Sequence, residues 1–143
     1  MPKRSASAMW SGDLKGGKGT LSTESGVLKG VPYSYARRFE NEPGTNPEEL
    51  VAAAHAGCFS MAFSNILANK GMTPERVETS AVATFEKTDA GFAVTEIHLE
   101  CSAKVGGADK AKFDAAADEA KRTCPISRLL APGTRITLNA KLA

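Results

Sequence analysis

The sequence predicts an α+β fold with largely antiparallel sheets, and three observations support this prediction. The expected order of elements is short strands, a long helix, a hairpin, a second helix and a closing strand. Residues 92–105 and 134–142 alternate apolar and polar side chains, which indicates strands with one buried face. Helices do not alternate singly with strands, as they would in a βαβ repeat. With 143 residues, the chain is expected to form a single domain spanning 1–143.

The composition narrows the classes of function. Lys and Arg total 18 against 16 acidic residues, and this net charge of +2 does not indicate a nucleic-acid partner. The basic start "MPKRSASAMW" has no apolar segment after it, so no signal peptide is expected. No run of about 18 apolar residues indicates a transmembrane helix, and we expect a cytoplasmic protein. The three cysteines are then expected to stay mostly reduced, so any disulfide would be transient and catalytic.

The first third of the chain is expected to form three strands. Residues 5–10 and 18–23 flank the turn "SGDLKGGKG", and residues 31–39 are predicted to form a third strand that is irregular at Pro32. Arg37 and Arg38 are adjacent on that strand. Neighbouring strand residues face opposite sides, so only one of the two arginines is expected to point inward.

A long helix is predicted from residue 47 to about residue 70. Asn46 suits the N-cap, Pro47 suits the first helical position, and Glu49 stands where it can complete a capping box. Gly71 is a natural stop. The middle of the helix contains small residues that allow close approach of another helix: Ala52, Ala53, Ala54, Ala56 and Gly57.

A hairpin and two further elements follow. Residues 76–88 and 92–105 are predicted to pair across "TDAG", with Cys101 on the inward face and His98 on the outward face. A helix over about 109–123 and a closing strand at the C-terminus complete the order. Because Cys101 lies among inward apolar side chains, we interpret it as a packing residue.

Two other cysteines lie in helical surroundings. The residue before a proline is disfavoured in a helix, so Pro125 is expected to begin a short helix over 125–130 with Cys124 at its N-cap. Unpaired N–H groups there lower a thiol pKa, although Cys124 could equally be a small joint residue. Cys58 lies mid-helix among small side chains, where it could simply pack. As a nucleophile it would need a cation from elsewhere, such as an arginine of "ARRFE".

Three stretches together carry a family resemblance. They are "WSGDLKGGKGTLSTESGVL", "RFENEPGTNPEELVAAAHAGCFSMAFS" and "KRTCPIS". They resemble the OsmC-type branch of the OsmC/Ohr family, the thiol-dependent organic hydroperoxide reductases, over nearly the whole chain. The resemblance implies an OsmC-like fold in which long central helices pack between sheets. It also implies an intertwined homodimer with active sites at the subunit interface.

The resemblance also implies roles for four residues. Cys58 would attack the peroxide and become a sulfenic acid, and Cys124 would resolve it as a Cys58–Cys124 disulfide. Arg38 would stabilise the Cys58 thiolate, and Glu48 would hold the Arg38 guanidinium. A dithiol of the dihydrolipoyl type would recycle the disulfide, and no cofactor or metal is implied.

Helix geometry adds one constraint. Glu48 and Cys58 are ten residues apart, which is about 15 Å of rise on one helix. If both belong to one site, a second chain is expected to supply Glu48.

Two interpretations from other classes remain open. A metal-binding module could use His55, Cys58 and Cys124, although it lacks a fourth ligand and His55 is more simply a core histidine. A non-catalytic, stress-related dimeric binding protein would use its cysteines only for packing.

For a peroxidase, five apolar residues near the motifs could make the site prefer organic peroxides to hydrogen peroxide: Phe39, Phe59, Met61, Leu129 and Leu130.

Overall fold

The computed structural model describes all residues 1–143 as two compact units, residues 1–50 and residues 51–143. The first unit contains β1 (Ala6–Ser11), β2 (Lys18–Thr23), β3 (Val31–Tyr33) and α1 (Tyr35–Phe39). Helix α2 (Pro47–Asn69) begins in the first unit and continues into the second. The second unit adds β4 (Arg76–Thr88), β5 (Gly91–Lys104), α3 (Lys110–Thr123), α4 (Pro125–Leu130) and β6 (Arg135–Leu142). The α+β class is confirmed, whereas a single domain over 1–143 stays a prediction.

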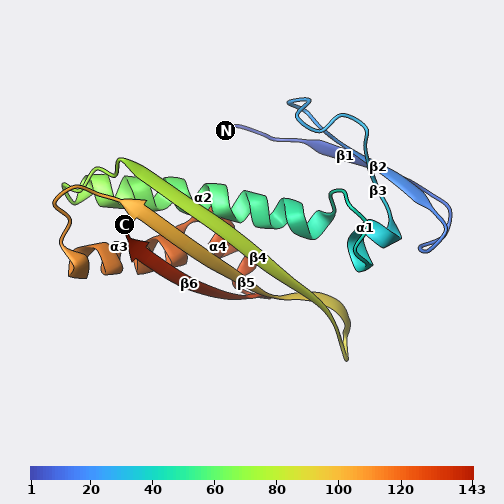
Figure 1. The fold of residues 1–143 in the computed structure, drawn as a ribbon. Helices are drawn as coiled ribbons and strands as arrows, with labels where there is room; N and C mark the ends of the chain where they lie inside the picture. The colour runs from blue at the N-terminus through green and yellow to red at the C-terminus, as the bar shows by residue number, and fades with distance from the viewer. The chain divides into compact units, whose positions relative to one another are not determined.

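Residues 1–50 contain a three-stranded antiparallel sheet in the order β1–β2–β3 (Figure 1). The rings of Trp10 on β1 and Tyr33 on β3 lie 5.3 Å apart, on either side of Gly19 on β2. A Cβ atom at Gly19 would lie 2.5 Å from both rings, so only glycine allows this aromatic contact across the sheet.

The predicted strand over 31–39 is wrong beyond Tyr33. The chain leaves β3 and forms the short helix α1, whose N-cap Ser34 accepts a hydrogen bond at its Oγ from the Arg37 N–H at 3.2 Å. Arg37 and Arg38 therefore lie on a helix, where neighbouring side chains diverge by about 100° rather than 180°. The opposite-face argument for the two arginines no longer holds.

The limits of α2 agree with the prediction to within a residue. Asn46 Oδ1 accepts the N–H of Glu49 at 2.8 Å, as an N-cap should. At the other end, Gly71 has a φ of +79°, and the Met72 N–H returns to the Leu67 carbonyl at 2.9 Å. This is a Schellman ending, in which glycine adopts the left-handed conformation at little cost.

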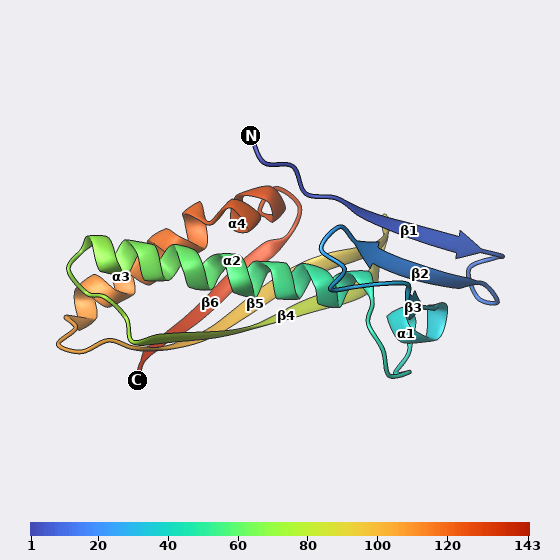
Figure 2. The same ribbon diagram turned by 90° about the horizontal axis from the view of Figure 1, so that it is seen from above.

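Residues 51–143 form one sheet with helices on one face. Strands β4 and β5 pair antiparallel, whereas β5 and β6 pair parallel, so this sheet is mixed rather than purely antiparallel. Parallel neighbours need a crossover, and α3 and α4 carry the chain back to the starting end of β5. Figures 1 and 2 show α2, α3 and α4 on the same side of this sheet.

The core lies between these helices and the inward face of β5. The alternation predicted for β5 is confirmed, because four inward residues are almost completely buried: Ile97, Leu99, Cys101 and Ala103. Val105, just after the strand, is buried as well. The rings of Phe59 and Phe63 on α2 and Phe113 on α3 are in contact, the first pair tilted and the second edge to face, with centroids 5.6 and 5.1 Å apart. Cys124, just before α4, is part of this core, and Cys58 on α2 packs against it.

Helix α2 is long and apolar enough to cross a membrane by length and composition alone, which the sequence analysis did not anticipate. The core helix of a globular protein passes the same test, so a single such helix is weak evidence. Here one side of α2 packs in the core through Ala52, Phe59, Phe63 and Leu67. Only 22% of its apolar window is buried, so much of the helix surface is uncovered in the single chain.

Candidate active site

Cys58 and Cys124 lie together in residues 51–143. Their sulfur atoms are 3.0 Å apart, within hydrogen-bonding distance, and both thiols are free. Cys58 occupies the middle of α2 and is partly exposed, whereas Cys124 is completely buried. The structure therefore brings together the two cysteines that the sequence analysis selected.

Cys124 is the N-cap of α4, as predicted. Its sulfur accepts the N–H of Ser127 at 3.5 Å, and Pro125 is the first residue of the helix. Burial alone would raise the pKa of Cys124, but hydrogen bonds from Cys58, Ser127 and the Ile126 N–H outweigh it. The pKa of Cys124 is therefore lowered, and the thiolate is favoured at this sulfur.

Cys58 has the opposite tendency. Burial raises the pKa of Cys58, and its hydrogen bond with Cys124 raises it further, while the Ile126 N–H acts in the other direction. No basic side chain of residues 51–143 contributes to this shift. The pair thus shares a proton that belongs mainly to Cys58, unless a cation from elsewhere favours its thiolate.

Arg38 and Glu48 form a second constellation within residues 1–50. The Arg38 Nε lies 3.1 and 3.2 Å from the two carboxylate oxygens of Glu48, and Nη2 lies 2.8 Å from Oε1. The Glu48 side chain is only 11% exposed and that of Arg38 is 35% exposed. This fork fixes the plane of the guanidinium, which a lysine could not achieve.

Arg37 has different partners. Its Nε donates to the Pro43 carbonyl at 3.1 Å and lies 3.6 Å from Glu42. The two adjacent arginines on α1 therefore differ in their contact partners, and they do not face opposite sides of a strand.

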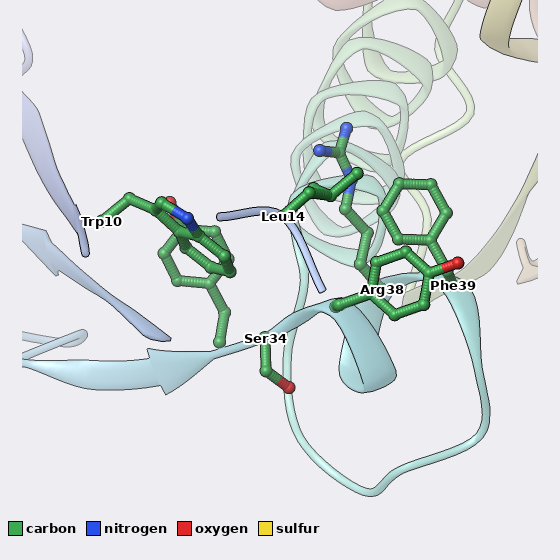
Figure 3. A pocket seen from close by; sticks show the side chains of 7 residues that line it. Trp10, Leu14, Ser34, Arg38 and Phe39 are labelled. Carbon is green, nitrogen blue, oxygen red and sulfur yellow. The ribbon is translucent and has the colours of Figure 1, made fainter. Parts of the chain in front are cut away.

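A pocket of about 190 Å³ opens beside Arg38. Most of its lining is aromatic or apolar: Trp10, Leu14, Tyr33, Tyr35 and Phe39, together with Ser34. Figure 3 shows Trp10 on one side of the pocket and Phe39 on the other, with Leu14 and Arg38 between them. An apolar group held here would lie next to a guanidinium.

The five apolar residues named from the sequence do not gather at one place. Phe39 lines this pocket, whereas Phe59 is completely buried in the core of the second unit. Met61 and Leu129 are 77% and 71% exposed. Leu130 packs against the core. Sequence reasoning did not single out Trp10, Leu14, Tyr33 or Tyr35, because the pairing of β1, β2 and β3 brings them together.

Cys101 and His55 are both buried in the core of residues 51–143. Cys101 is 1% exposed, and burial raises its pKa despite a hydrogen bond from Thr79. His55 is completely buried, with Nε2 2.7 Å from Ser127 Oγ. No group of three or more His, Cys, Asp or Glu side chains is arranged to hold a metal ion.

Comparisons with known proteins identify the family of this chain. A model of the OsmC-like protein family matches residues 39–139. Peroxiredoxin OsmC of Escherichia coli is 51% identical over 135 residues, which cover 94% of this chain and 93% of that protein. An organic hydroperoxide resistance protein of Xanthomonas axonopodis is 32% identical over 96 residues, or 66% of each chain.

A solved structure supports the fold. The organic hydroperoxide resistance protein OsmC of Legionella pneumophila superposes with a TM-score of 0.72, covering 97% of both chains at 23% identity. The fold and the cysteine pair thus define a thiol-dependent peroxidase. The chain belongs to the OsmC-like protein family, which confirms the resemblance seen in the sequence. The interpretation as a non-catalytic binding protein is set aside.

Proposed function

We propose that this protein reduces organic hydroperoxides to alcohols, with Cys58 as the nucleophile and Cys124 as the resolving residue. The observation that carries the proposal is the 3.0 Å separation of the two sulfurs, one partly exposed and one buried. A partly exposed thiol can meet a peroxide from solvent, whereas a buried thiol beside it is protected until the first has reacted.

The proposed chemistry has three balanced steps. The Cys58 thiolate attacks the distal oxygen of R–OOH, the O–O bond breaks, and the alkoxide takes a proton to leave as R–OH. The sulfenic acid of Cys58 then condenses with Cys124, forming the S–S bond and releasing water. An external dithiol reduces this disulfide by two thiol–disulfide exchanges and is itself oxidised to a disulfide.

Arg38 is proposed as the cation that Cys58 lacks within its own unit. The raised pKa of Cys58 leaves its thiolate scarce at neutral pH without such a charge. A guanidinium locked by Glu48 can stabilise the thiolate and orient the peroxide oxygens without further rearrangement. Whether one chain or two chains supply the Arg38–Glu48 pair to a given Cys58 decides the architecture of the site.

We propose a homodimer for two reasons. The ten-residue spacing between Glu48 and Cys58 on α2 corresponds to about 15 Å, which is too far for both to serve one site from a single helix. The uncovered surface of α2 also includes small residues, among them Ala53, Ala54 and Gly57, that suit close helix packing. A second copy would cover this surface and bring Glu48 to the partner's cysteine.

The pocket beside Arg38 supports the preference for organic hydroperoxides. Its aromatic lining can bind an alkyl or aryl group while the polar end of the substrate meets the guanidinium. Hydrogen peroxide has no such group to bury. The relatives named for organic hydroperoxide resistance agree with this substrate class.

The reductant is proposed to be a dithiol of the dihydrolipoyl type, in a cytoplasmic setting where thiols stay reduced. Intact mass after one equivalent of cumene hydroperoxide tests the central claim. We expect a loss of 2 H from the reduced chain through a Cys58–Cys124 disulfide, about 2 Da. A gain of one oxygen that persists, or no change, would contradict the proposed resolution by Cys124.

A further inference from the structure

His55 and Ser127 are the two polar side chains in the buried core of this protein, and the proposed chemistry does not use them. His55 is 0% and Ser127 is 1% exposed. His55 comes from α2, one turn before Cys58, and Ser127 comes from α4, three residues after Cys124. Burying two polar side chains carries a desolvation cost that apolar residues at the same positions would not have. Their presence beside the cysteines therefore needs a physical reason.

Ser127 contacts both His55 and Cys124. Its Oγ lies 2.7 Å from His55 Nε2. Its N–H donates to Cys124 Sγ at 3.5 Å, and its side chain is among the groups that lower the pKa of the Cys124 thiol. A single serine therefore joins the imidazole on one helix to the resolving thiol on another.

The second nitrogen of His55 decides the direction of this hydrogen-bond chain. Nδ1 is buried and has no hydrogen-bond partner. A proton on Nδ1 would leave a buried N–H donor unsatisfied, which is the rarer and costlier arrangement. With the proton on Nε2, the imidazole donates to Ser127 Oγ, and the serine proton is free to point at Cys124. Burial also lowers the pKa of His55, which keeps the ring neutral.

We infer that Ser127 hydrogen-bonds directly to the Cys124 thiolate during resolution and that His55 is a positioning residue that aims the Ser127 hydroxyl. This inference deepens the proposed function and rests on it. In the step concerned, Cys124 gives up its proton and its thiolate attacks Cys58 Sγ. The S–S bond forms, the S–O bond of the sulfenic acid breaks, and hydroxide leaves and takes up a proton to become water. His55 neither gains nor loses a proton in this step.

The experiment separates the two chemical steps. The full-length protein is reduced and mixed with one equivalent of cumene hydroperoxide. The rate of peroxide consumption measures the first step, and the rate of disulfide formation measures the second. Four variants are compared: Ser127→Ala and His55→Leu remove donors, whereas Ser127→Thr and His55→Gln keep a hydroxyl and a nitrogen donor. Ser60→Ala is the matched control, because Ser60 is another helix serine with a short side-chain hydrogen bond, from its Oγ to the Thr79 hydroxyl at 2.7 Å.

We expect no slowing of the first step in any variant, because a less stabilised Cys124 thiolate moves the shared proton away from Cys58 rather than toward it. Disulfide formation should slow about tenfold in Ser127→Ala and His55→Leu, the effect of losing one hydrogen bond to a charged group. The midpoint of its pH profile should move upward as the Cys124 thiolate becomes scarcer. Ser127→Thr or His55→Gln should recover most of the rate, and trapping by dimedone should show more Cys58 sulfenic acid in the slow variants.

Three results would overturn the inference. Unchanged resolution in both Ser127→Ala and His55→Leu would leave the proposed function standing and remove the role of this pair. Equal slowing in Ser60→Ala would show that the loss of any helix-anchoring hydroxyl suffices. Dimedone on Cys124 rather than Cys58 in the wild type would instead refute the assignment of the two cysteines on which the inference rests.

Discussion

The sulfurs of Cys58 and Cys124 lie 3.0 Å apart although 66 residues separate them in the chain. Their surroundings differ in kind, because Cys124 caps a helix and has a lowered pKa while Cys58 lies mid-helix with a raised pKa. In a resting pair the thiolate therefore belongs mainly to the buried sulfur. In the proposed mechanism Cys58 needs an added positive charge at the partly exposed sulfur, and Arg38, held by Glu48, is the proposed source of that charge.

The first prediction concerns the two cysteines themselves. Cys58→Ser should abolish peroxide reduction, because the nucleophile is gone. Cys124→Ser should consume about one peroxide per site and then stall as sulfenic acid or over-oxidise. Peroxide titration with and without a dithiol distinguishes the two outcomes.

Cys101 provides the matched control. It is buried on the inward face of β5 with a raised pKa, so Cys101→Ala should turn over normally. Peptide mapping that finds Cys101 in the main disulfide, or normal turnover of Cys124→Ser with a dithiol, would refute the pairing.

A second prediction concerns Arg38. Arg38→Ala should raise the pKa of Cys58, and turnover near neutral pH should fall by about tenfold for each unit of that increase. Because the defect is a shortage of thiolate, activity should partly recover as the pH rises. Arg38→Lys should restore only part of the activity, since an ammonium cannot make the two-pronged contact with Glu48.

Arg37→Ala is the control for this experiment. Arg37 contacts the Pro43 carbonyl and Glu42 rather than Glu48, so its loss should change turnover little. The measurement is the pH dependence of Cys58 alkylation in wild type and the three variants. A shifted profile in Arg37→Ala with an unshifted one in Arg38→Ala would show that the wrong arginine has been chosen.

The Arg37 and Arg38 positions also show where local sequence patterns fail. Five residues make too short a helix for an apolar period to appear, and the aromatic residues of "VPYSYARRF" resemble a strand. The serine at position 34 was the available signal, because serine is a good N-cap. By contrast, Cys124 was placed correctly because a proline restricts the residue before it.

Contacts between distant segments were beyond the reach of sequence patterns. His55 and Ser127 are 72 residues apart, and only the packing of α4 against α2 joins them. The parallel pairing of β5 with β6 depends likewise on where α3 and α4 return the chain. The alternation in β5 was predictable, because it reflects a single buried face.

A third prediction uses the titration of His55. Burial lowers its pKa in the folded state, while in the unfolded chain it titrates near 6.5. Below that pH the unfolded state binds a proton that the folded state does not, so the free energy of unfolding falls as the pH falls. The slope from this group can reach about 1.4 kcal/mol per pH unit. Between about pH 7 and pH 5, His55→Gln should therefore lose stability less steeply than wild type.

Urea denaturation at three pH values measures this slope. His98→Gln removes the other histidine, which lies on the outward face of β5, and is the matched control for His55→Gln. Identical slopes in wild type and His55→Gln would show that the buried imidazole becomes protonated in the folded protein.

The last prediction concerns the dimer. Gly57 lies on the exposed side of α2, and a Cβ atom placed there would meet nothing within 4 Å in the single chain. Gly57→Leu should therefore fold at least as well as wild type, because leucine favours a helix by about 1 kcal/mol over glycine. If two copies pack closely along this side, the added side chain has no room, and the variant should be shifted toward monomer.

Ala115→Leu, at an exposed position on α3, adds a comparable side chain away from α2 and should stay dimeric. Light scattering across a dilution series measures the shift, and peroxide turnover should fall with it because Glu48 would no longer reach a partner's Cys58. A wild-type protein that is monomeric and fully active, or a Gly57→Leu variant as dimeric as the control, would contradict the proposed assembly.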